Sequence, residues 1–110
     1  MKLKQAPFDM MESGEKTIEL RLYDEKRQQI SIGDEIEFSC VTDANRCLQR
    51  RVIALHTFDS FEKLYASLPL LKCGYTEQNV STASPLDMEQ YYSKEEQSRF
   101  GVVGIEMEII

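Results

Sequence analysis

Alternation of apolar and polar residues in three separate segments constrains the fold more than any other feature of this chain. The alternating segments are Thr17–Leu22, Glu35–Phe38 and Gly101–Ile110. A period of two residues is typical of strands with one buried face, because successive side chains point to opposite sides of a sheet. We therefore expect three strands, each with one apolar face turned toward a core.

The first alternating segment follows a short helix signal. Pro7 lies in the expected first turn, and Gly14 has the position of a C-terminal cap. In the strand that follows, three apolar side chains would face the core and three polar side chains would face away from it. The apolar set is Ile18, Leu20 and Leu22, and the polar set is Thr17, Glu19 and Arg21.

Further strand and helix signals complete the pattern. A third strand is expected over Cys47–Phe58, where imperfect alternation predicts a bulge. Ser60 is a cap for a helix over Phe61–Leu68 with one apolar stripe. Ser84-Pro85 and Ser93–Glu96 carry the signals of two more short helices. Short helices among strands predict an α+β fold, most simply a small mixed barrel or a strongly curved sheet.

The length of 110 residues suits one apolar core, so we expect a single domain over residues 1–110. With 42% hydrophobic and 29% charged residues, the composition is that of an ordinary globular protein. No apolar run approaches the roughly 18 to 20 residues that span a bilayer, and the N-terminus lacks the layout of a secretory signal. We expect a cytosolic protein without a membrane partner.

The cysteines and the histidine do not form a metal-binding pattern. Cys40, Cys47 and Cys73 are an odd number without CxxC spacing, and His56 has no metal-ligating neighbour in sequence. We therefore expect structural thiols and neither a metal nor another cofactor. His56 could act as a general base, but its place in a predicted strand favours a partly buried structural role.

The net charge of −6 opposes general attraction to nucleic acids. Residues 1–52 hold 9 Lys and Arg against 10 Asp and Glu, whereas residues 53–110 hold 4 against 9. A polyanion would therefore bind to the first half. One candidate patch there combines Lys26, Arg27, Arg46, Arg50 and Arg51. The alternative is a solvated face in which these cations are balanced by Asp24, Glu25 and Asp43.

The segment from Gly14 to Arg21, with Gly14, Lys16, Glu19 and Arg21 at its specified positions, resembles the GxKxxExR signature of the ASCH family. Two later landmarks, Ile32-Gly33-Asp34 and the ending from Tyr91 to Ile105, are similar to the family as well. The resemblance covers nearly the whole chain. It implies a PUA-like mixed β-barrel with short inserted helices, a cleft beside the motif, and binding of RNA or nucleotides.

The resemblance also implies candidate activities. Some family members are ribonucleases, and others are similar to metal-independent hydrolases that deacetylate acetylated cytidine with a lysine and a threonine nucleophile. Lys16 matches that lysine, but Glu19 stands in the threonine position. Thr17 lies two residues away, roughly 6–7 Å along a strand. If the chain is an enzyme, Lys16 and Glu19 are the candidates for proton transfer.

The resemblance favours a nucleotide site around the motif, and the residue types there suit one. Arg21 offers a planar fork for phosphate, Lys16 a compact cation, and Glu19 an acceptor or base. An exposed Tyr91 or Tyr92 could stack on a base, and we select Tyr92. The predicted ligand-binding set is Lys16, Thr17, Glu19, Arg21, Lys26, Arg27 and Tyr92. The alternative is a surface salt-bridge cluster, in which the motif cations pair with Glu19 and Asp24.

Three function classes remain open from the sequence. The first is an RNA- or nucleotide-binding module, and the second is a hydrolase acting on RNA or a modified nucleoside. The third is a protein-interaction adaptor that uses the acidic second half of the chain. The segment Cys73–Ser84 is predicted to be a loop long enough to take part in function.

Overall fold

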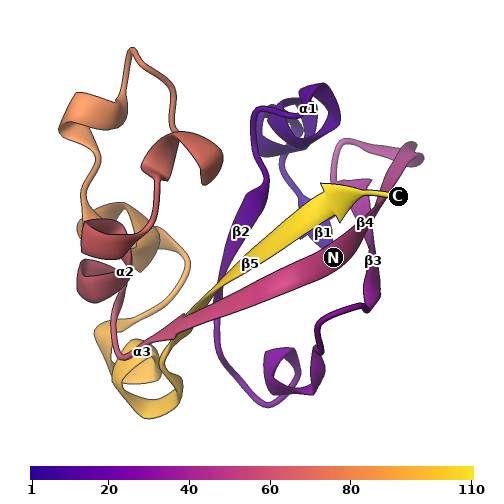
Figure 1. Cartoon of the computed structure of the whole chain (residues 1–110). Helices are drawn as coiled ribbons and strands as arrows, with labels where there is room; N and C mark the ends of the chain where they lie inside the picture. Colours follow the sequence, from indigo (N-terminus) through magenta and orange to yellow (C-terminus); the bar gives the residue numbers. More distant parts are fainter.

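Five strands form one curled sheet in the computed structural model, which describes all 110 residues (Figure 1). The order across the sheet is β1-β3-β4-β5-β2. The strands are β1 (Lys2–Leu3), β2 (Ile18–Leu22), β3 (Glu35–Cys40), β4 (Asp43–Phe58) and β5 (Val102–Ile109). The β1–β3 pair is parallel and the other pairs are antiparallel. The two edge strands, β1 and β2, therefore both come from the first part of the chain.

Short helices connect and cover the sheet. They are α1 (Gln5–Ser13), η1 (Arg27–Gln29), α2 (Phe61–Ser67), η2 (Leu70–Lys72), η3 (Val80–Thr82), η4 (Pro85–Gln90) and α3 (Lys94–Phe100). The last five lie between β4 and β5 in the sequence and group beside β2 in space (Figure 1). We call residues 59–101 the helical insert. This arrangement confirms the expected α+β fold with a mixed, barrel-like sheet and inserted helices.

The local sequence signals are confirmed at the element ends. Gly14 ends α1 with a φ of 88°, a conformation that glycine adopts without a steric penalty. Ser60 caps α2, and Ser93 forms a capping box with Glu96 at the start of α3. The Ser84-Pro85 signal starts a 3₁₀ helix, and the β4–β5 register shifts between Val52 and Ala54, within the strand for which the alternation predicts a bulge.

The core has two parts, one on each face of the sheet. One part packs β1 and α1 against β3, β4 and β5, and includes Val103 and Ile105. The other packs the helical insert against the opposite face, and includes Leu20, Leu22 and Val102. The apolar face of β2 is therefore buried, as its alternation predicted, and the insert is what covers it. None of the helices combines the length and the hydropathy that crossing a membrane requires.

The polar face of β2 departs from the prediction that it faces out of the core. In the β2–β5 register, Glu19 lies opposite Ile105 and Arg21 lies opposite Val103, and directly opposed residues share one face of a sheet. That face is the inner one, covered by β1 and α1. Glu19 is consequently only 4% exposed. Alternation identified the two faces of β2, but the curl of the sheet buries both of them.

Candidate functional site

A buried ion cluster joins three residues of the ASCH-like motif. Lys16 Nζ lies 2.8 Å from Glu19 Oε1, and Arg21 Nη2 lies 2.7 Å from Glu19 Oε2. Arg21 Nε also donates to Glu19 Oε2, at 2.9 Å. Both oxygens of one carboxylate are therefore held by separate cations, and the cluster is not a surface salt bridge.

The cations determine the ionisation of Glu19. Burial alone would raise the pKa of this carboxyl, because a charge is costly to remove from water. Coulombic attraction and hydrogen bonds from Lys16 and Arg21 outweigh the burial, and the pKa of Glu19 is lowered from its ordinary value of 4.5. Glu19 is thus a fixed anion at neutral pH.

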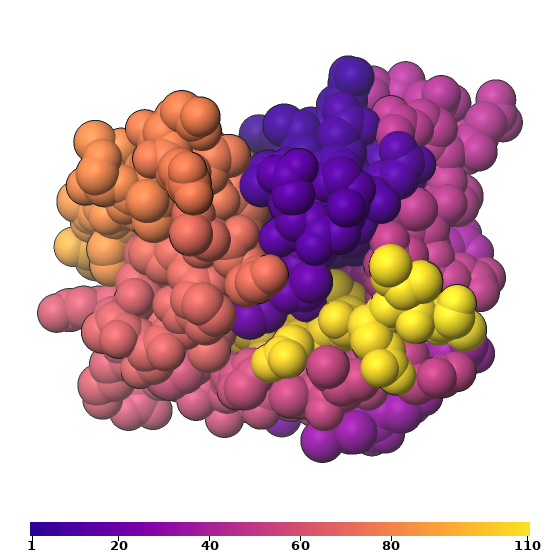
Figure 2. Space-filling model, turned by 45° about the horizontal axis from the view of Figure 1, so that its top comes forward, coloured from indigo at the N-terminus to yellow at the C-terminus, as the bar shows by residue number.

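Lys16 connects the barrel with the helical insert. Its side chain is 7% exposed, and its Nζ donates to the carbonyl oxygen of Cys73 at 3.4 Å. Thr17 makes a second link, because its backbone nitrogen donates to the carbonyl oxygen of Lys72 at 2.9 Å. Figure 2 shows the insert lying directly beside the N-terminal segment on this face of the molecule. The residues directly before β2 are therefore bonded to the end of η2 and to the loop that follows it.

Arg21 closes the sheet at the opposite end of the cluster. Its Nη2 donates to the carbonyl oxygen of Lys2 on β1, at 2.9 Å. No backbone ladder joins β1 and β2, which are the two edges of the sheet. We call the gap between them the seam. The Arg21 guanidinium bridges this seam.

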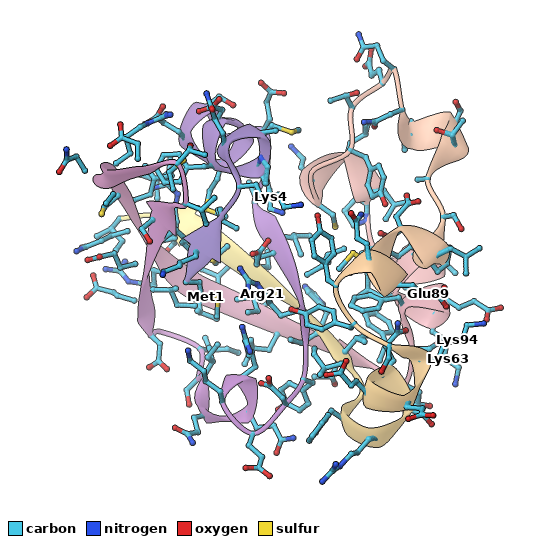
Figure 3. All side chains as sticks on the ribbon, turned by 180° about the vertical axis from the view of Figure 1, so that it is seen from behind. Met1, Lys4, Arg21, Lys63, Glu89 and Lys94 are labelled. Atoms are coloured by element: carbon cyan, nitrogen blue, oxygen red, sulfur yellow. The ribbon has the colours of Figure 1, made fainter.

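A cleft of about 500 Å³ opens at the seam, and we call it the seam cleft. Its walls come from β1, α1, β2, α2, the loop Cys73–Tyr75, and η4 with the two residues after it. The charged residues that line it are four cations and two carboxylates: Lys2, Lys4, Lys16, Arg21, Glu19 and Asp87. Figure 3 shows Lys4 and Arg21 near the middle of the molecule, far from Lys63 and Lys94 at the outer side of the insert. The cleft is thus locally cationic in a chain of net charge −6.

Four tyrosines of the insert also line the seam cleft. They are Tyr65, Tyr75, Tyr91 and Tyr92. Tyr92 stacks on Phe61 with ring centroids 6.2 Å apart and an interplanar angle of 15°, so the core occupies one of its faces. Tyr91 is 51% exposed, and Lys4 Nζ lies 5.2 Å from its ring centroid. Of the pair, Tyr91 is the more available for stacking on a ligand, whereas the sequence predicts Tyr92 for this role.

The Cys73 thiol and the phenols of Tyr65 and Tyr75 in the cleft are not activated as nucleophiles. Burial raises the pKa of the Cys73 thiol to about 11, although Lys16 lies nearby. Burial also raises the pKa of the Tyr65 and Tyr75 phenols. No three His, Cys, Asp or Glu side chains are placed together to hold a metal ion. The lining of the cleft offers hydrogen-bonding groups, charge and aromatic surface.

Three residues of the predicted ligand-binding set lie away from the seam cleft. Thr17, Lys26 and Arg27 do not line it. Thr17 uses its backbone to bind Lys72 and Met107, and Arg27 pairs with Asp24 at 2.9 Å. The structure therefore gathers Lys16, Glu19, Arg21 and Tyr92 of that set.

The other candidates from the sequence also lie elsewhere. Arg46 pairs with Asp9 and Glu12, Arg51 lies 3.6 Å from Glu108, and Arg50 donates to the Met11 carbonyl oxygen. His56 Nε2 lies 2.8 Å from Glu106 Oε1, across the β4–β5 pair. None of these residues lines the seam cleft. Each takes part in local pairing on the sheet or against α1.

Several cleft residues escaped the sequence reasoning. Lys2 belongs to an edge strand too short to show alternation, Lys4 directly precedes α1, and Asp87 is visible only as a helix-capping residue. Tyr65 fits the apolar stripe of α2, which is the usual pattern of a core residue. Tyr75 lies in the segment Cys73–Ser84, whose length alone makes it a candidate for function, and residues 73–75 of this segment line the cleft.

Comparison with known proteins identifies the family. A sequence model described as the ASCH domain matches residues 1–110. The chain belongs to the ASCH domain family. ASCH domains are PUA-like and generally bind RNA. No curated protein matches this ASCH domain closely enough to be counted as a relative.

Two solved structures resemble this ASCH domain over nearly their whole length. The crystal structure of the hypothetical protein PH0355 shares 29% identity with a TM-score of 0.73, and the match covers 100% of both chains. The solution structure of protein PF0455 from Pyrococcus furiosus shares 27% identity with a TM-score of 0.68. That match covers 98% of this chain and 96% of PF0455. Both support the curled sheet with its inserted helices.

Proposed function

We propose that this ASCH domain binds nucleotides, as units of single-stranded RNA or free, in the seam cleft. The observation that carries the proposal is the concentration of four cations and four tyrosines around one cleft of an acidic chain. Cations bind phosphate, and aromatic rings stack on unpaired bases. A cleft of about 500 Å³ is in the size range of small-ligand sites and suits a single nucleotide rather than a duplex.

The cations have separate roles in this proposal. Lys16 and Arg21 are held by Glu19, which fixes their positions but leaves part of their hydrogen-bonding capacity free. Lys2 and Lys4 are exposed and line the same cleft without an ion-pair partner. We therefore assign the phosphate contacts to Lys2 and Lys4 first, and the positioning of the nucleotide to Arg21.

Binding is better supported than hydrolysis. A general base needs a pKa near the working pH, whereas the pKa of Glu19 is lowered and both of its oxygens are occupied. The thiol of Cys73 has a raised pKa and is a weak nucleophile. The hydrolase hypothesis, with proton transfer by Lys16 and Glu19 on RNA or acetylated cytidine, has no further support from the cleft.

A matched pair of double variants tests the proposal. Lys2→Ala with Lys4→Ala removes two cleft cations, and Lys63→Ala with Lys94→Ala removes two cations at the outer side of the insert. Both variants change the net charge equally. We expect the cleft variant alone to weaken binding of a short single-stranded RNA, and to lower its salt slope by about 0.7 for each phosphate that is no longer neutralised.

The outcomes separate the three function classes. Equal weakening in both variants would indicate attraction to overall charge and would contradict a site in the cleft. Mass spectrometry after incubation with short RNA and with acetylated cytidine should show retained ligand and no product. Formation of product would favour the hydrolase, and absence of any binding would favour the protein-interaction adaptor.

A further inference from the structure

A chain of hydrogen-bonded side chains lines the insert side of the seam cleft. The phenolic oxygens of Tyr65 and Tyr75 lie 2.6 Å apart, and Tyr75 Oη donates to Asp87 Oδ2 at 2.7 Å. All three residues line the cleft. They come from α2, the loop after η2 and η4, so three separate elements converge on one short polar chain.

The hydrogen positions in this series of hydrogen bonds are set by the Asp87 carboxylate. Asp87 Oδ2 also accepts from the backbone N–H of Ser84, at 3.2 Å, as part of the capping box of η4. A carboxylate only accepts hydrogen bonds, so the single hydroxyl hydrogen of Tyr75 is directed to Asp87. Tyr65 must then donate its own hydrogen to the oxygen of Tyr75. The Tyr65 oxygen keeps free lone pairs but has no free hydrogen.

The environment holds this arrangement in place. The Tyr65 ring packs edge to face against Phe61, with centroids 6.5 Å apart at 85°, and against Tyr75, with centroids 5.8 Å apart at 78°. Burial raises the pKa of both phenols, and they therefore keep their hydrogens at neutral pH. Tyr65 thus presents a fixed acceptor in a cleft whose other polar groups are mainly cationic donors.

We propose that the Tyr65 oxygen is a specificity-determining acceptor that selects nucleotides carrying a hydrogen-bond donor, with Tyr75 and Asp87 as positioning residues. The inference rests on the proposed nucleotide binding. Cations of the cleft serve the phosphate, which leaves the neutral part of the ligand to Tyr65. The donor chemistry has two sources in a nucleotide, a sugar hydroxyl and a base amino group. A ligand without the donor leaves the Tyr65 acceptor unpaired and binds more weakly.

Two pairs of ligands show whether the donor is the sugar hydroxyl or the base amino group. Adenosine monophosphate and its 2′-deoxy form differ in one sugar hydroxyl, and adenosine and purine riboside monophosphates differ in the base amino group. We expect calorimetry to show a preference of roughly tenfold for the donor-bearing member of one pair. Tyr65→Phe should abolish that preference by weakening only the donor-bearing ligand. Tyr75→Phe removes the oxygen that accepts the hydrogen of Tyr65, so Tyr65 can donate instead of accepting. This variant should therefore reduce the same preference although Tyr65 is unchanged.

Tyr23→Phe is the matched control, because Tyr23 packs against the other part of the core and does not line the cleft. It should leave both affinity ratios unchanged. Ratios near one in the wild-type protein, or ratios that Tyr65→Phe does not change, would overturn the role of Tyr65 and leave nucleotide binding intact. Failure of every nucleotide and RNA to bind would overturn both proposals.

Discussion

The guanidinium of Arg21, on one edge strand of the sheet, donates a 2.9 Å hydrogen bond to the backbone carbonyl of Lys2, on the other edge strand. A side chain thereby connects two strands that share no ladder. The Glu19 carboxylate orients this guanidinium by accepting from Arg21 Nε and Nη2. Lys16 binds the other oxygen of the same carboxylate. The ASCH motif therefore has a structural role at the seam as well as a position in the cleft.

Glu19→Gln should destabilise the protein strongly. The change keeps the volume but leaves two buried cations opposite a neutral amide, so the free energy of unfolding should fall by about 3 kcal/mol. Urea unfolding measures the difference. Glu108→Gln is the control, because Glu108 is an exposed partner of Arg51 at 3.6 Å and its loss should cost less than about 1 kcal/mol. Similar losses in both variants would contradict the burial of the Glu19 charge.

The same carboxylate makes stability depend on pH with a defined sign. The pKa of Glu19 is lower in the folded protein than its ordinary value of 4.5. The unfolded chain therefore binds a proton first as pH falls, and the stabilisation from Glu19 is complete above about pH 4.5 and is lost below it. Urea unfolding between about pH 7 and pH 3 should show a steeper fall in stability for the wild-type protein than for Glu19→Gln. If the free energy of unfolding falls equally with pH in both proteins, Glu19 does not contribute to the loss of stability in acid.

The sequence predicted the elements better than it predicted their surroundings. Alternation in β2 separated Leu20 and Leu22 from Glu19 and Arg21 correctly, because the period of a strand is a local property. It could not show that the polar face is the inner one, since that depends on how β1 and α1 close over the curled sheet. A strand of two residues such as β1 carries too few positions to reveal a pattern.

For the candidate site as well, the sequence predicted what is local and missed what depends on tertiary packing. The motif supplied Lys16, Glu19 and Arg21, whose spacing in one segment keeps them close. Tyr65 and Asp87 reach the cleft only through the packing of the insert, and each has a sequence signal that fits a structural role. Sequence spacing identifies neighbours along an element, whereas a cleft formed by several elements requires the tertiary structure.

For Arg51, the structure leads to a different prediction from the sequence, which places this residue in a cationic patch for RNA. It lies beside Glu108 on the sheet and does not line the seam cleft. Arg51→Ala should therefore leave both the affinity for short single-stranded RNA and its salt slope unchanged. A slope reduced by about 0.7 would indicate that RNA contacts this residue and extends beyond the cleft.

Gly74 tests the link between Lys16 and the insert. Its φ of +111° is unfavourable for other residues, and a Cβ atom there would lie 3.4 Å from Lys16 Nζ. Gly33 is the control, since its φ is +96° and a Cβ atom there would meet nothing within 4 Å. We expect both alanine variants to lose about 1 to 2 kcal/mol of stability from backbone strain, and Gly74→Ala alone to weaken nucleotide binding. Thermal unfolding and calorimetry measure the two effects, and equal binding by both variants would contradict a role for this loop.

Tyr91 is the residue whose exposure best suits base stacking at the mouth of the cleft. It is half exposed beside Lys4, whereas Tyr92 already stacks on Phe61. Tyr91→Ala should weaken binding of a short single-stranded RNA by about 1 kcal/mol or more, and Tyr91→Phe should bind like the wild type, because stacking requires the ring and not the hydroxyl. Leu86→Ala removes an exposed apolar side chain of the neighbouring η4 that lies outside the cleft. Fluorescence anisotropy with a labelled RNA should show weaker binding for Tyr91→Ala than for this control. An equal loss of affinity in Leu86→Ala would mean that the RNA contacts the exposed surface of η4 and does not stack on the ring of Tyr91.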